Sequence, residues 1–130
     1  SRNGRVDGYY SGYTFANQLG VTTQVPYMVE IVSNNASARV REVNLHGRRV
    51  LLRKARVLVT KENYRILQFL DFLKDIDQYA DENDKILSDR IRKYVVDVQI
   101  KKTEIDCYIK QYPDRIYRYI YEMRLYDVFA

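Results

Sequence analysis

The spacing of the apolar residues changes near Thr60, and this change limits the folds open to the chain. Before Thr60, apolar residues gather in short runs rich in β-branched side chains, and the run 27–32 predicts a mostly buried strand. After Thr60 they recur at every third or fourth position, which places them on one side of a helix. This order predicts an α+β fold, with a small, mainly antiparallel sheet in the N-terminal half packed by about four C-terminal helices.

The N-terminal half is also expected to hold a short helix and a hairpin. Aromatic and aliphatic residues over 13–19 predict the helix, and Gly20 follows it as a C-cap. The stretches 39–45 and 48–59 predict the hairpin, whose turn at His46-Gly47 uses the freedom of glycine at positive φ. The 130 residues fit one domain, and no internal repeat or glycine-rich linker divides them.

The C-terminal half predicts four helices, each with a row of inward apolar residues. Thr60, Thr103 and Asp114 are the candidate N-caps of the first, third and fourth helix. A polar link over 80–84 separates the first two helices, and Pro113 ends the third because helices usually stop before proline. The expected inward residues are Ile66, Phe69, Leu70, Leu73 and Ile76, then Leu87, Ile91, Tyr94, Val95 and Val98, then Ile105, Tyr108 and Ile109, and finally Ile116, Ile120 and Met123.

The basic residues are unevenly distributed along the chain. The net charge is +5, but residues before Thr60 carry +6 and the remainder carries −1. Guanidinium groups bind phosphate in a fixed fork, so an arginine cluster favours nucleic acid as the partner, although a solvated sheet face is an equally weighted interpretation. Alternation along strands places Arg39 with Arg41 on one face and Arg49 with Arg53 on one face, while the register between them stays open. The predicted nucleic-acid-binding residues are Arg39, Arg41, Arg48, Arg49, Arg53, Lys54 and Arg56.

Tyrosine is abundant, and seven of the 13 tyrosines fall between Tyr94 and Tyr126. Tyrosine rings can stack on unpaired bases. However, Tyr117, Tyr119 and Tyr121 alternate within a predicted helix and therefore point to different sides. The favoured interpretation is packing of the rings with the hydroxyl groups at the surface.

Few residues offer catalytic or metal-binding chemistry. A lone His46, expected to be exposed at its turn, and a lone Cys107, expected in the core, cannot make a structural zinc site or an internal disulfide. Asp71, Asp75 and Asp77 are expected on a solvated helix surface. We therefore predict no enzymatic activity, no cofactor and no metal. No run of about 18 to 20 apolar residues and no signal peptide is present in the sequence, so a cytoplasmic protein without membrane contact is expected.

Three stretches together resemble the AbiEi-type antitoxin family of prokaryotes, in its smaller form with an N-terminal winged helix and a C-terminal α+β domain. These stretches are YSGYTFANQLGVTTQVP at 10–26, RVREVNLHGRRVLLRKAR at 39–56 and YPDRIYRYIYEMRLYDVFA at 112–130. The winged helix would lie upstream of Ser1, so the resemblance implies the C-terminal domain alone.

The resemblance implies an antitoxin of an abortive-infection or type IV toxin–antitoxin system, whose partner toxin is similar to a nucleotidyltransferase. The family commonly also represses its own operon, and its basic face would map onto the seven predicted cationic residues. Sequence-specific operator binding is not expected without the winged helix. The alternative from a different class is a stand-alone RNA-binding or DNA-binding module that uses the same arginines.

Overall fold

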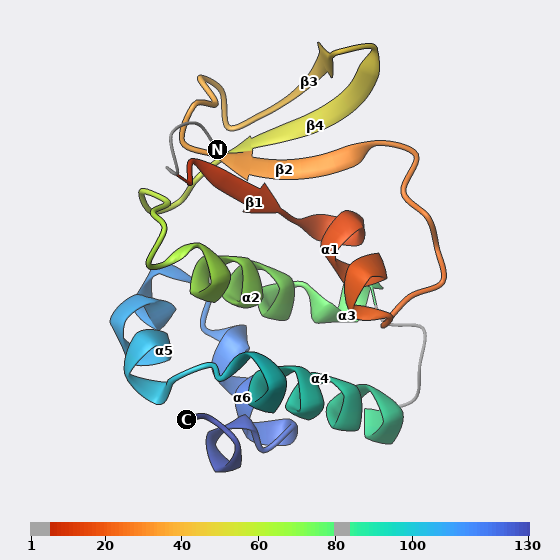
Figure 1. Ribbon diagram of the computed structural model, residues 1–130. Helices are drawn as coiled ribbons and strands as arrows, with labels where there is room; N and C mark the ends of the chain where they lie inside the picture. Colours follow the sequence, from red (N-terminus) through yellow and green to blue (C-terminus); the bar gives the residue numbers. More distant parts are fainter. Residues whose placement is uncertain (1–5, 80–83) are drawn as a thin grey trace.

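The computed structural model describes residues 6–79 and 84–130, and it has the predicted α+β fold. The N-terminal elements are β1 (Gly8–Tyr10), α1 (Gly12–Leu19), β2 (Val29–Ser33), β3 (Val40–Leu45) and β4 (Arg48–Lys54). The C-terminal elements are α2 (Tyr64–Lys74), α3 (Ile76–Tyr79), α4 (Asp84–Val98), α5 (Lys102–Tyr108) and α6 (Arg115–Glu122), with 3₁₀ turns at Ile109–Gln111 and Leu125–Asp127. Figure 1 shows the sheet at one end of the molecule and helices α2 to α6 at the other.

The four strands form one mixed sheet in the order β1-β2-β4-β3. The pairs β1–β2 and β3–β4 are antiparallel, whereas β2 and β4 are parallel. β4 lies inside the sheet because the chain passes from β2 to the far edge, forms β3, and returns through the hairpin. Sequence analysis did not predict β1, since three residues that include Gly8 are too few to reveal alternation.

The hairpin turns at His46 and Gly47, as predicted, with φ angles of 53° and 79°. Two consecutive residues at positive φ match the twist of the flanking strands, which makes this kind of turn common in hairpins. The side-chain oxygen of Asn44 accepts a hydrogen bond of 3.1 Å from the Gly47 N–H and so closes the turn.

The prediction that the second hairpin strand continues to residue 59 is wrong, because β4 ends at Lys54. Beyond Lys54, a side chain makes the backbone hydrogen bonds that a neighbouring strand would otherwise make. Asn34, just beyond β2, donates from Nδ2 to the Val59 carbonyl and accepts at Oδ1 from the Val59 N–H, both at 2.8 Å. One amide therefore satisfies both backbone groups of Val59, which is buried outside the sheet.

The predicted inward residues of the first C-terminal helix are all buried, but the helix itself is interrupted. The backbone breaks at Asp75, so Ile76 begins the short helix α3. At the other end, Asn63 rather than Thr60 is the N-cap. The two residues bond each other reciprocally, since Asn63 Oδ1 accepts from the Thr60 N–H at 2.7 Å and Thr60 Oγ1 accepts from the Asn63 N–H at 3.2 Å.

The remaining helices follow the predicted rows closely. The predicted inward residues of α4, α5 and α6 are buried or partly buried. Lys101, not Thr103, precedes α5, and residues 80–83 of the predicted polar link lie outside the described residues. In α6, Tyr119 is buried whereas Tyr117 and Tyr121 are exposed, so these rings point to different sides as predicted.

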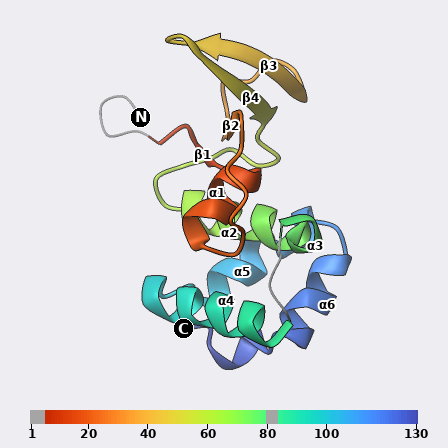
Figure 2. The same cartoon turned by 90° about the vertical axis from the view of Figure 1, so that its right-hand side faces the viewer.

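The main core lies around α2, between the other helices and the inner part of the sheet. Phe15 of α1 packs edge-on against Phe72 and Tyr94, which ties the N-terminal half to α2 and α4. Contacts between sheet and helices are concentrated on β1 and β2. The hairpin of β3 and β4 extends away from the helices, as both views show (Figure 1 and Figure 2). Of the described helices, none is long and apolar enough to cross a membrane.

Candidate nucleic-acid interface and the adjoining cleft

The register of the sheet divides the predicted basic residues between its two faces. We call the face that carries Tyr9 and Val32, both buried in the main core, the inner face, and the opposite one the outer face. Directly paired residues share a face, and neighbours along a strand lie on opposite faces. The inner face therefore holds Arg49 and Arg53, while the outer face holds Arg41 and Arg48, with Arg39 and Lys54 at its end.

The two inner arginines are close to carboxylates. Arg49 forms an ion pair with Glu42, with its Nε 2.7 Å from Glu42 Oε1, and its guanidinium carbon lies 5.4 Å from the ring centre of Tyr27. Hydrogen bonding to Glu42 raises the pKa of Arg49. Arg53 Nη2 lies 3.8 Å from Glu30 Oε1, a looser contact. Much of the positive charge on the inner face is therefore balanced.

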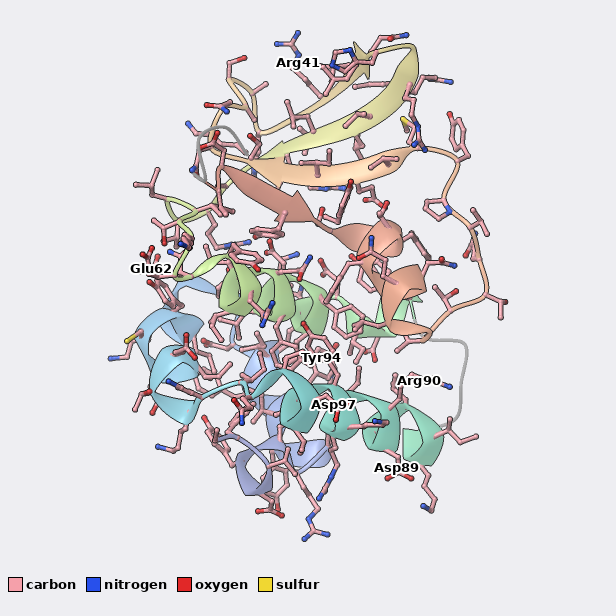
Figure 3. The ribbon with its side chains drawn as sticks, viewed as in Figure 1. Arg41, Glu62, Asp89, Arg90, Tyr94 and Asp97 are labelled. Atoms are coloured by element: carbon pink, nitrogen blue, oxygen red, sulfur yellow. The ribbon has the colours of Figure 1, made fainter. Side chains whose placement is uncertain are left out.

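The four outer cations lack such partners. Among the described residues, no carboxylate lies within 4 Å of the charged groups of Arg39, Arg41, Arg48 or Lys54. Arg41 donates only to the hydroxyl of Ser37, at 3.3 Å. All four side chains are exposed, and Figure 3 shows Arg41 at the end of the molecule farthest from α4. Within the part of the chain that the structure describes, the outer face is therefore a surface of positive charge without carboxylate partners.

Apolar side chains lie between these cations. The pairing of the strands places Tyr10, Ile31, Leu52 and Arg41 in one row across the outer face. Tyr10 is half-exposed, and Ile31 and Leu52 are partly buried. The row thus has an aromatic ring at one end and a guanidinium at the other, both of which can stack on planar ligands.

Arg56 belongs to neither face. Its Nη1 donates to the Gln111 carbonyl at 2.9 Å, and its guanidinium carbon lies 5.1 Å from the ring centre of Tyr112. The outer face thus carries four of the seven predicted residues. Two of these four, Arg39 and Lys54 at its end, also line the cleft described next together with Arg53 and Arg56, whereas Arg49 lies apart.

A polar cleft of about 610 Å³ lies on the inner side of the sheet. Its walls come from the start of α1, from β2, the start of β3 and the end of β4, and from the ends of α2 and α3. The lining includes Arg39, Arg53, Lys54, Arg56 and Lys74 as cations and Glu30, Asp71 and Asp75 as carboxylates. Sequence analysis did not predict this cleft, because its residues are scattered from Ser11 to Tyr79.

Asp71 and Asp75 are not on a solvated surface, so their predicted placement is wrong. Their side chains are 14% and 16% exposed, whereas Asp77 is 72% exposed, as predicted. Tyr9 of β1 donates a hydrogen bond to Asp71 Oδ2. Burial raises the pKa of Asp71, partly offset by this bond and by the charge of Lys74, and burial also raises the pKa of Tyr9. The side of α2 that carries Asp71 is therefore also covered, because the sheet packs against it.

Glu30 holds the start of α1 in place. Its Oε2 accepts a hydrogen bond of 2.8 Å from the Tyr13 N–H, and its own N–H donates to Thr14 Oγ1 at 3.0 Å. Gly12, the residue before Tyr13, has a φ of +55°, and a Cβ there would lie only 2.3 Å from the Glu30 carboxylate. The positive φ favours glycine here, and a side chain would displace the Glu30 carboxylate from its place at the start of α1.

Two basic residues neutralise the carboxylates at the helical wall. Lys74 lies 4.0 Å from Asp71 and forms a closer ion pair with Asp75. Arg115 of α6 adds a contact of 2.8 Å to Asp75 and also donates to the Lys74 carbonyl at 2.7 Å. Each carboxylate of the cleft is therefore already bonded to protein donors.

Two residues that line the cleft have hydroxyl groups without a hydrogen-bond partner among the described residues. Ser11 is 5% exposed, and its Oγ is buried without a hydrogen bond among the described residues. The ring of Tyr79 packs on Phe72 and Tyr13, and its hydroxyl makes no hydrogen bond to the described residues either. Burial raises the pKa of Tyr79 further above the physiological range, in which a tyrosine hydroxyl is already a neutral donor.

The other two candidate residues lie away from the cleft. His46 is exposed at the hairpin turn, as predicted. The prediction that Cys107 is in the core is wrong, because its thiol is exposed. Ile105 and Ile109 fill the inward side of this segment, and a residue midway between them points outward. No group of three or more potential metal ligands occurs among the residues that the structure describes.

Comparison with known proteins adds no relative. No family model, no curated protein and no solved structure matches the chain.

Proposed function

We propose that this chain is a non-catalytic antitoxin and transcriptional-regulator domain of a bacterial toxin–antitoxin or abortive-infection system, and that it contacts nucleic acid through the outer face of its sheet. The antitoxin role is supported by the resemblance of three stretches of the sequence to the AbiEi-type family. The nucleic-acid contact is supported by one observation above all, the four outer cations without carboxylate partners among the described residues.

Electrostatics favours a phosphate backbone as the ligand of this face. Four cations on one face attract phosphates of any sequence, and such contacts supply affinity without reading bases. Tyr10 and Arg41, at the two ends of one row, offer flat groups on which unpaired bases can stack. We therefore expect weak binding that prefers single strands and shows little sequence preference.

The salt dependence of binding tests this interface. We expect the double variant Arg41→Gln with Arg48→Gln to reduce the magnitude of the negative slope of log K against log salt by about one to two units. Each lost phosphate contact removes about one released counterion. The measurement is fluorescence anisotropy of a labelled single-stranded oligonucleotide from about 50 to 200 mM salt.

Arg49→Gln is the matched control for this experiment. Arg49 neighbours Arg48 on β4 but lies on the inner face in an ion pair with Glu42, so its loss should leave the slope unchanged. A double variant with the slope of the unmodified chain would remove the outer face from the binding site.

Co-expression tests the antitoxin role. The chain is produced together with a nucleotidyltransferase-like toxin, the partner that the resemblance implies, and growth is scored with a reporter driven by the promoter of their operon. Rescue of growth with a derepressed reporter is the expected result. A folded chain that gives no rescue at matched expression would contradict the antitoxin role and would favour a stand-alone nucleic-acid-binding module.

A further inference from the structure

We propose that the cleft on the inner side of the sheet is a second site, which binds the phosphate monoester of a nucleotide, either free or at the end of a nucleic-acid strand. The cleft shares Arg39 and Lys54 with the end of the outer face but does not include Arg41 or Arg48, and the proposal does not depend on binding at those two residues.

The first step is the charge of the cleft. Five cationic and three carboxylate side chains line it, which leaves a formal charge of +2. A phosphate monoester carries about −1.5 to −2 at pH 7, so it matches this excess. A phosphodiester within a strand carries one negative charge and matches it less well.

The second step is that the carboxylates are already occupied. Glu30 binds the Tyr13 N–H, Asp71 binds Tyr9, and Asp75 binds Lys74 and Arg115. These contacts hold the three carboxylates on protein donors and away from the cations at the end of β4. Arg53 has only the loose contact with Glu30, and Lys54 has no carboxylate partner among the described residues.

The third step is the pair of free hydroxyl groups. Ser11 is one of the lining residues, and its buried Oγ lacks a partner among the described residues, a rare state that costs stability unless a ligand or water supplies one. The Tyr79 hydroxyl is a second neutral donor in the same lining. Neutral donors beside an arginine form the usual surroundings of a bound phosphate.

The fourth step is size. A volume of about 610 Å³ falls within the roughly 300 to 1,000 Å³ of small-ligand sites. A single phosphate ion would leave most of it empty, whereas a mononucleotide has a sugar and a base to fill the remainder.

The test uses the full chain and adenosine 5′-monophosphate as the probe, with adenosine as the control ligand, measured by isothermal titration calorimetry. We expect the monophosphate to bind and adenosine to bind at least tenfold more weakly. Ser11→Ala and Arg53→Gln should each lower the affinity for the monophosphate by about tenfold, since each removes a donor to a charged group. Arg49→Gln, on the same face of the same strand but outside the cleft lining, should leave the affinity unchanged.

A thermal unfolding measurement separates binding from folding. Ser11→Ala removes a buried group without a partner, so the variant should unfold at the same temperature as the unmodified chain or higher. Equal affinity for monophosphate and adenosine, no binding of either, or full affinity in both cleft variants would overturn the proposal.

Oligonucleotides distinguish the two sources of the phosphate. If strand ends are the ligand, a 5′-phosphorylated oligonucleotide binds more tightly than its 5′-hydroxyl counterpart, and Arg53→Gln abolishes the difference. If free nucleotides are the ligand, the two oligonucleotides bind alike while the monophosphate still binds. The outer variant Arg41→Gln with Arg48→Gln should lower the affinity for both oligonucleotides but not for the monophosphate. The experiment therefore tests the outer face and the cleft independently.

Discussion

Single residues show where the chain has no freedom of choice, and Gly12 is the clearest case. Its φ is positive, and the carboxylate of Glu30 occupies the space where a Cβ would be. The residue is therefore constrained twice, once by its backbone and once by its neighbour. Gly47 has a similar φ of +79° but open space around it.

The pair of glycines gives a matched prediction. Gly47→Ala should cost about 1–2 kcal/mol, the usual cost of a left-handed conformation with a side chain. Gly12→Ala should cost at least about 1 kcal/mol more, because the displaced Glu30 carboxylate loses its bond to the Tyr13 N–H. Urea unfolding followed by circular dichroism measures both, and equal losses would show that the carboxylate moves aside freely.

Other single residues show the limits of a helical pattern. The spacing of α2 predicted its buried row correctly, yet it also implied that the opposite side faces water. Asp71 is covered because Tyr9 and the sheet approach that side, and no local pattern carries this information. Cys107 shows the opposite error, since an apolar neighbourhood in sequence is not burial when the apolar neighbours face the other way.

At the scale of elements, the segment after β4 depends on Asn34. The two hydrogen bonds of this side chain hold Val59 where a strand partner would otherwise be needed. They lie between β2 and the start of α2, so they fix the path by which the chain leaves the sheet.

Asn34→Ala should lower the free energy of unfolding by about 1–3 kcal/mol, because it leaves the N–H and carbonyl of a buried residue without partners. Asn35→Ala is the control. Its side chain is exposed and makes no hydrogen bond among the described residues, so a change within about 0.5 kcal/mol is expected. Chemical denaturation measures the free energy of unfolding of both variants. Equal values for Asn34→Ala and Asn35→Ala would mean that water replaces the Asn34 amide as the partner of Val59.

Elements were predictable from sequence where their signal is local. The hairpin turn, the C-cap at Gly20 and the rows of α2, α4 and α6 were predicted because spacing and turn chemistry specify them. The end of β4 and the short strand β1 were not, because both depend on partners distant in sequence.

The whole molecule divides into a packed helical body and a projecting hairpin. Burial concentrates in α2 and its neighbours, whereas nearly every residue of β3 is exposed. Stability should therefore be unevenly distributed, since exposed segments with few packed side chains open at low free energy.

We expect amide hydrogens of β3 to exchange well before those of α2 and α6 under native conditions. Hydrogen exchange followed by mass spectrometry measures this, with Ile66 to Leu73 of α2 as the internal reference. Equal protection in β3 and α2 would mean that the hairpin opens only with the whole molecule.

The candidate sites follow the same division between local and distant information. The outer face was partly predictable, because strand alternation paired Arg39 with Arg41, but which arginines share it depended on the register. The cleft was beyond prediction, since Ser11, Arg53 and Asp71 meet only through the tertiary fold.

The strand order also leaves β3 as an edge of the sheet, with one row of backbone N–H and C=O groups unpaired by any described strand. Such an edge can recruit a strand from another copy and start aggregation. Arg41 and Glu42 near its start place opposite charges along this edge, a common protection against such growth. The charge that we propose for binding would thus also oppose self-association, and an apolar residue at Arg41 should promote self-association where glutamine does not.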